Sequence, residues 1–208
     1  MSIKAIATAE KELYDRLYDG RCCDTTGYWR EIAGYIAATS QPKDKLLDIG
    51  CGHGDPTRLL CSLDRNCVGV DISLAGLGSQ RKTGSEYDEF LPTCSFTEAP
   101  IWDMPFEDNE FDYTFSFDVM EHIPTEAVEA SIRELYRVTK GKMLHCISVE
   151  DDPMYVEAHK TVKPIKWWKA QFAAGNTEGI ETGLFAPDKF KILMHITAQE
   201  AYDSGDTA

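Results

Sequence analysis

Asp48, Gly50, Gly52 and Gly54 form the pattern D-x-G-x-G-x-G at the end of the apolar run "LLDI". Glycines that follow a strand allow a ligand to approach the backbone closely, because no Cβ stands in the way. A dinucleotide site has the pattern G-x-G-x-x-G, and here Asp55 stands where its third glycine would be. A carboxylate beside this turn repels a pyrophosphate and attracts a cation. The pattern therefore favours a ligand that carries positive charge.

S-Adenosylmethionine is a ligand of this kind, because its ammonium and sulfonium groups outweigh its single carboxylate. Its ribose also has two hydroxyl groups, and an ionised carboxylate can accept a hydrogen bond from each of them. Asp71, which follows the apolar run "NCVGV", is the candidate for this role. The alternative interpretation is that Asp71 caps the helix that follows it.

Strand and helix patterns alternate around these residues, which predicts an α/β fold with a mostly parallel sheet. Ligands of such sheets bind at the carboxyl ends of the strands. Amphipathic helices are expected at 4–19, 27–38, 56–63, 73–82, 124–139 (ended by Gly141) and 163–174. Strands are expected at 45–50, 66–72, 94–99, 111–117 and 142–149, with a closing hairpin at 179–185 and 189–198.

Length and composition limit the possible classes. A chain of 208 residues fits one domain, and no apolar run is long enough to span a bilayer. The first residues, "MSIKAIATAEKELYDRL", lack the apolar core of a secretory signal, so we expect a cytoplasmic protein. The seven cysteines include no C-x-x-C pair, which predicts neither a disulfide framework nor a zinc site.

A net charge of −14 argues against a nucleic-acid partner, because phosphate neutralisation needs a basic surface. The densest basic stretch, "HKTVKPIKWWK", holds four lysines and leaves open a local basic patch. A small or cationic ligand is the partner that this composition favours, and no membrane partner is expected.

Four stretches in order resemble a known family. "LLDIGCGHG" resembles the first motif of class I S-adenosylmethionine-dependent methyltransferases, and "VGVDIS" resembles their second-strand motif. "APIWDMPFEDNEFDYTFSFDVMEHIP" resembles the third and fourth blocks of the small-molecule branch, of methyltransferase type 11, which includes ubiquinone and menaquinone methyltransferases. The resemblance runs from about Lys45 to Lys140. It implies a Rossmann-like three-layer sandwich with a seven-stranded sheet whose last two strands form an antiparallel hairpin.

The resemblance also implies a function. It predicts a single methyltransferase domain, residues 1–208, that transfers a methyl group to an oxygen or nitrogen atom of a small-molecule acceptor. Residues 45–150 would bind the cofactor S-adenosyl-L-methionine, and the helices of residues 1–40 would form part of a lid over the substrate.

The same resemblance assigns cofactor contacts. Asp71 would bind the ribose, Asp103 the exocyclic amine of the adenine, and the Met104 amide a ring nitrogen. Near the methionyl amino group we expect the Phe117 carbonyl or the Asp118 side chain, with Asp48 at the same end. The alternative for Asp103 is a solvated acidic loop. The expected cofactor-binding set is Asp48, Gly50, Cys51, Gly52, Gly54, Asp71, Ile72, Asp103, Met104, Phe117 and Asp118.

Two histidines are the catalytic candidates. His122, in "EHIP", follows the fourth strand and could accept a proton from the acceptor, although it could equally bond a loop backbone. His159 is the second candidate, while His145 is expected inside a strand. We expect no metal ion; the alternative is a magnesium site between Asp118 and Glu150–Asp152.

Two other classes remain as alternatives. A protein of this fold could bind the cofactor without transferring a methyl group. A nucleic-acid or protein methyltransferase is the second alternative. A nucleic-acid enzyme would be expected to carry an N-P-P-Y or D-P-P-Y block where this chain has "FDVM".

Overall fold

The computed structural model describes residues 2–19, 29–79, 94–150, 157–173, 180–184 and 191–197. Within these ranges the strands are β1 (Lys45–Ile49), β2 (Asn66–Asp71), β3 (Ser95–Glu98), β4 (Phe111–Phe117), β5 (Thr139–Ser148), β6 (Ile180–Leu184) and β7 (Lys191–Thr197). The α-helices are α1 (Ile3–Asp19), α2 (Trp29–Thr39), α3 (Asp55–Ser62), α4 (Ala75–Ser79), α5 (Val128–Val138) and α6 (Ile165–Ala173). Two short 3₁₀ turns, η2 (Met120–His122) and η3 (Thr125–Ala127), precede α5.

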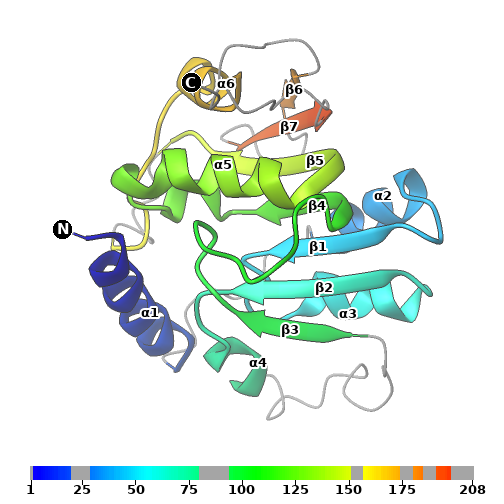
Figure 1. Cartoon of the computed structure of the whole chain (residues 1–208), viewed down its shortest axis with the longest axis horizontal. Coiled ribbons are helices and arrows are strands. Elements are labelled where there is room, and N and C mark those ends of the chain that lie inside the picture. Colours follow the sequence, from blue (N-terminus) through cyan, green and yellow to red (C-terminus); the bar gives the residue numbers. More distant parts are fainter. Residues whose placement is uncertain are drawn as a thin grey trace.

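These strands form a single seven-stranded sheet in the order β3-β2-β1-β4-β5-β7-β6 (Figure 1). The first five strands pair in parallel, and β7 is antiparallel to both β5 and β6. The predicted fold class is therefore confirmed. The chain leaves β1 towards β3 and returns to β4 on the other side of β1. Such a reversal opens a ligand crevice at the carboxyl ends of the two central strands.

Helices cover both faces of the sheet. Successive residues of a strand point to opposite faces, and in β1 Leu46 and Leu47 pack into two different apolar clusters. One cluster includes residues of α5 and α6, and Figure 1 shows α5 lying across that face. The other cluster includes residues of α2 and α3. Among the described helices, none has the length and apolar character that crossing a membrane requires.

The junction between α5 and β5 differs from the prediction. The helix ends at Val138, and Gly141 lies inside β5 instead of ending the helix. A Cβ at Gly141 would collide with the carbonyl oxygen of Asp112, at the place where the pairing of β4 with β5 shifts register. Gly141 is therefore needed for the close approach of two strands, a role that its position after a helical pattern does not reveal.

The cysteines also differ from the prediction, which expected no disulfide framework. Cys61, in α3, and Cys94, directly before β3, form a disulfide across 33 residues of sequence. The two residues meet because the parallel crossover brings α3 beside β3, which residue spacing alone does not show.

Candidate active site

The turn after β1 is built on three glycines in the left-handed backbone region. Their φ angles are +66° at Gly50, +51° at Gly52 and +80° at Gly54, values that strain residues with a Cβ. The amides of Gly50 and Cys51 donate to the carbonyl of Val70 at 2.7 and 3.1 Å. The turn is therefore fixed against the carboxyl end of β2.

Asp71, the last residue of β2, points its carboxylate at this turn. Its Oδ2 accepts the Gly52 amide at 2.9 Å and the Tyr18 hydroxyl at 3.3 Å, and its Oδ1 accepts the Ser73 amide at 3.0 Å. Burial raises the pKa of Asp71, and these hydrogen bonds oppose that shift. The side chain serves both the turn and the segment that follows β2, so the capping interpretation and a ligand role are compatible.

Asp48 is buried in β1, where its Oδ2 accepts the Thr57 hydroxyl at 2.6 Å. Burial raises the pKa of Asp48 to about 7; Thr57 opposes the shift and the negative charge of Asp71 adds to it. A cation placed beside Asp48 would favour its ionised form, because opposite charges attract strongly where water is excluded.

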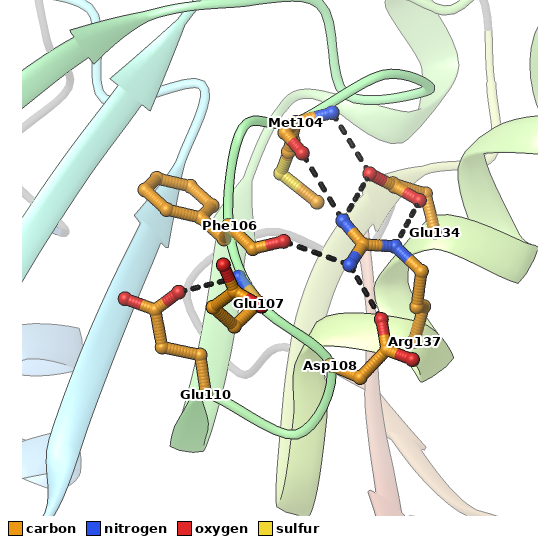
Figure 2. Close-up of polar contacts among 7 residues, drawn as sticks. All are labelled: Met104, Phe106, Glu107, Asp108, Glu110, Glu134 and Arg137. Atoms are coloured by element: carbon orange, nitrogen blue, oxygen red, sulfur yellow. Dashed lines mark hydrogen bonds and ion pairs between the residues drawn. The ribbon is translucent and has the colours of Figure 1, made fainter.

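The loop between β3 and β4 contains the two residues expected at the adenine, Asp103 and Met104. Asp103 is exposed there, but the Met104 amide donates to Glu134 Oε1 at 2.8 Å and the Met104 side chain is buried (Figure 2). The Met104 amide is therefore already engaged by the protein, and its contact with an adenine ring nitrogen stays a prediction. Glu134 lies on α5, far along the sequence, so the motif around Asp103 could not reveal this contact.

The end of β4 lies against the glycine turn. Asp118 has a left-handed φ of +53°, and its amide donates to the Cys146 carbonyl at 3.0 Å. A Cβ on Gly50 would collide with the side chain of Val119. Phe117 and Asp118 therefore reach the same edge of the sheet as the turn, as predicted from their place in the sequence.

His122 and His159 meet at this edge. Their rings pack edge to face with centroids 4.7 Å apart, and the Tyr14 ring lies 6.3 Å from that of His122. The amides of Lys160 and Thr161 donate to the carbonyl of Glu121 at 2.9 and 2.8 Å, which fixes one histidine segment against the other. His145, in contrast, is buried inside β5, as predicted.

Glu121 is a site residue that the sequence did not single out. It is buried, and its Oε1 accepts the Ser148 amide at 2.9 Å. One ligand atom each from Glu121, His122 and His159 lies within 4.8 Å of the others, a spacing that a divalent cation could bridge. Of the alternative magnesium site at Asp118 and Glu150–Asp152, residues 151–152 lie outside the described ranges.

Helix α1 lies beside the carboxyl ends of β1 and β2 (Figure 1), and its role as part of a lid stays a prediction. Besides the Tyr18 contact with Asp71, Asp15 accepts the Ser73 hydroxyl and Lys11 pairs with Glu98 at 3.2 Å. Helix α2 instead packs with α3 in the apolar cluster on the face of the sheet that lies opposite α5. Of the segment 1–40, α1 rather than α2 covers the edge.

Sequence comparisons identify related proteins. Residues 47–147, from β1 to β5, match the protein family described as a methyltransferase domain. The chain is 32% identical to the 2-phytyl-1,4-naphtoquinone methyltransferase of Nostoc sp. over 143 aligned residues. The aligned region covers 66% of this chain and 60% of that protein. It is also 32% identical over 103 residues to cycloartenol-C-24-methyltransferase of Arabidopsis thaliana, and this aligned region covers 48% of this chain and 29% of that protein. The chain thus spans less than two thirds of the length of these relatives.

A solved structure shares the fold. Magnesium protoporphyrin IX methyltransferase from Synechocystis, solved with bound S-adenosylmethionine, superimposes with a TM-score of 0.69 at 16% identity, over 92% of this chain and 96% of that one. The family match and this fold agree with the resemblance carried by the glycine turn and the strand-end acids. The chain therefore contains a methyltransferase domain of the class I S-adenosylmethionine-dependent family.

Proposed function

We propose that this protein transfers a methyl group from S-adenosylmethionine to an oxygen or nitrogen atom of a small molecule. The observation that carries the proposal is the arrangement at the carboxyl edge. A buried strand-end carboxylate, Asp71, lies beside a turn that contains three glycines, and the paired rings of His122 and His159 lie beyond the end of β4.

The residues at this edge fit the cofactor chemically. Asp71, with Ile72 next to it, would accept the ribose hydroxyls, and Asp103 would accept the exocyclic amine of the adenine. Asp48 and Asp118 would supply negative charge for the methionyl ammonium, and the Phe117 carbonyl would accept a hydrogen bond from it, with Gly50, Cys51, Gly52 and Gly54 lining its approach. When bound, the cofactor supplies a methyl group that is already electrophilic.

On the acceptor side, we propose that His122 accepts the proton that a hydroxyl acceptor must lose. General-base help of this kind is typically worth roughly 10²–10⁴ in rate. His159, packed against the His122 ring, orients it and is the alternative base. The remaining contribution of the protein is alignment of the acceptor, for which we propose that α1 closes over the edge.

A small-molecule acceptor agrees with the net charge of −14, which disfavours nucleic acid. The names of the two relatives refer to a quinone and to a sterol, the second methylated at carbon. An acceptor screen should therefore include activated carbon atoms as well as hydroxyl and amino groups. We also propose that the reaction takes place in the cytoplasm, which fractionation of cells would test.

Calorimetry with S-adenosylhomocysteine tests the cofactor site. Asp71→Ala should weaken binding by about 2–3 kcal/mol, the cost of losing a charged hydrogen-bonding partner. Glu129→Ala, at a side chain that is 83% exposed on α5, is the matched control and should bind like wild type. Unchanged affinity in a folded Asp71→Ala variant would remove Asp71 from the site, and a wild-type protein that binds no S-adenosyl ligand would overturn the proposal.

Release of S-adenosylhomocysteine during an acceptor screen tests transfer itself. Once an acceptor is found, His122→Ala should lower kcat by roughly 10²–10⁴ with little change in cofactor affinity. His122→Asn keeps a hydrogen-bonding group without a base and separates orientation from proton transfer. Wild-type rates in both variants from pH 6 to 9 would show that His122 is not the base. His159 would then be the next candidate base to test.

A further inference from the structure

Arg137, near the end of α5, binds the backbone of the loop that joins β3 to β4. Its Nη1 donates to the Phe106 carbonyl and to Asp108 Oδ1, each at 2.7 Å, and its Nη2 donates to the Met104 carbonyl at 3.1 Å. Glu134, one turn earlier, accepts Nε and Nη2 at 2.7 Å and also accepts the Met104 amide at 2.8 Å. Figure 2 shows both side chains facing this loop.

These bonds use all three nitrogen atoms of the Arg137 guanidinium as donors. A planar group with five donors can hold a carboxylate in bidentate fashion and still bind two carbonyls, which the single ammonium of a lysine cannot do. The Arg137 backbone takes part as well, because its carbonyl accepts the Asn109 amide at 2.7 Å. The Glu134 side chain is only 13% exposed, so solvent competes little for these bonds.

The other end of the loop is attached to the cofactor edge. The Ala99 amide donates to the carbonyl of Asp71 at 2.9 Å, and the Asp103 amide donates to the Pro100 carbonyl at 3.1 Å. Asp103 directly precedes the first residue that Glu134 and Arg137 hold. Asp103 thus lies between a segment that is hydrogen-bonded to the end of β2 and a segment that is hydrogen-bonded to α5.

We propose that Glu134 and Arg137 are positioning residues for the adenine end of the cofactor. By holding the backbone at Met104 and Phe106, they fix Asp103 where its carboxylate accepts the exocyclic amine. This inference rests on the proposed function, from which the role of Asp103 is taken. Neither residue touches the cofactor; both act through the loop.

The test compares S-adenosylhomocysteine with S-inosylhomocysteine, in which a carbonyl oxygen replaces the amine. Wild-type protein should prefer the adenine ligand, because an oxygen facing a carboxylate is repelled. Asp103→Asn should reduce this preference by roughly tenfold or more, the value of a hydrogen bond to a charged group. Arg137→Gln should reduce it to a similar extent, and the double variant should lose no more than the single ones.

The ratio of the two affinities separates positioning from stability, because a protein that is merely less stable loses both ligands equally. Arg137→Lys keeps the positive charge but not the planar guanidinium, so it should give an intermediate ratio of affinities. This variant replaces Arg137→Gln in the test if Arg137→Gln does not fold. Arg133→Gln, on the same helix in an exposed pair with Glu129, should leave the ratio unchanged.

Three results would overturn parts of the argument separately. An unchanged ratio in the Arg137 variants, together with a reduced ratio in Asp103→Asn, contradicts the positioning role. An unchanged ratio in Asp103→Asn contradicts the role of the loop, while tight binding of S-adenosylhomocysteine to wild type still supports the proposed function. No binding of either ligand to wild type contradicts the proposed function itself.

Discussion

The hydroxyl of Tyr18 on α1 donates to Oδ2 of Asp71 at 3.3 Å, although the two residues are 53 positions apart in the sequence. The same carboxylate also accepts the amides of Gly52 and Ser73. A carboxylate has about four acceptor positions, and a ribose diol requires two of them. Cofactor binding at Asp71 therefore requires Tyr18 to release its position.

Tyr18→Phe should consequently raise the affinity for S-adenosylhomocysteine by about two- to tenfold, the net value of one hydrogen bond. Calorimetry measures the change, and Tyr35→Phe, at a side chain exposed on α2, is the matched control. A weaker affinity in Tyr18→Phe would instead show that this hydroxyl contacts the bound cofactor.

Binding of S-adenosylmethionine should strengthen as the pH rises through neutrality. The folded-state pKa of Asp48 is raised to about 7 by burial, so at pH 6 the carboxyl group is mostly protonated. A cationic ligand prefers the ionised form, so affinity should increase about tenfold between pH 6 and pH 8.

Asp48→Asn isolates this effect, because titration of the ligand itself is the same for both proteins. The variant should show a flatter pH profile than wild type. Thr57→Val removes a hydrogen bond that favours the ionised form, and it should move the profile of the wild type to higher pH. Identical profiles for wild type and Asp48→Asn would place the cation away from Asp48.

His145 should make the fold sensitive to acid. It is buried, its Nδ1 lies 2.8 Å from Ser116 Oγ, and burial lowers its pKa from 6.5 to about 3. Below pH 6.5 the unfolded chain binds a proton at this histidine that the folded chain does not, so stability falls as the pH falls from 6.5 towards 3. The loss amounts to about 1.4 kcal/mol per pH unit.

Urea unfolding at pH 7, 6 and 5 measures this loss for wild type and for His145→Gln. The difference between their slopes isolates His145 from other titrating groups, and the variant should be less sensitive to acid. Equal slopes would mean that the histidine is protonated in the folded state as well.

Methyl transfer should survive excess EDTA. The cofactor already carries the positive charge that activates its methyl group, and Glu121 Oε1 is occupied by the Ser148 amide. An assay with and without EDTA, at a fixed acceptor concentration, makes the measurement. Loss of activity that added magnesium or zinc restores would contradict this expectation and would make two groups candidate ligands, namely Glu121, His122 and His159, and Asp118 with Glu150–Asp152.

The parts of the site that could be predicted are local in sequence. The glycine turn and Asp48 lie within one short stretch, and alternating strand and helix patterns predict the parallel order that brings Asp71 to the same edge. Strand-end residues such as Asp118 follow from the same rule, because parallel strands end together.

The parts that were missed depend on contacts between distant segments. The bond of Glu134 to the Met104 amide, the contact of Tyr18 with Asp71 and the Cys61–Cys94 disulfide each join elements that only the fold brings together. Gly141 shows the same limit, since its need to be small arises from a neighbouring strand.

The attachment of α1 has a consequence for ligand exchange. Only Ile6 and Tyr18 of this helix are buried, and its ion pairs include those of the exposed Lys11 with Asp15 and with Glu98. Exposed ion pairs contribute about 0–1 kcal/mol each and weaken as salt screens them. We therefore expect high ionic strength to loosen the attachment of the helix to the edge while the sheet stays intact, and so to speed the release of a spent cofactor.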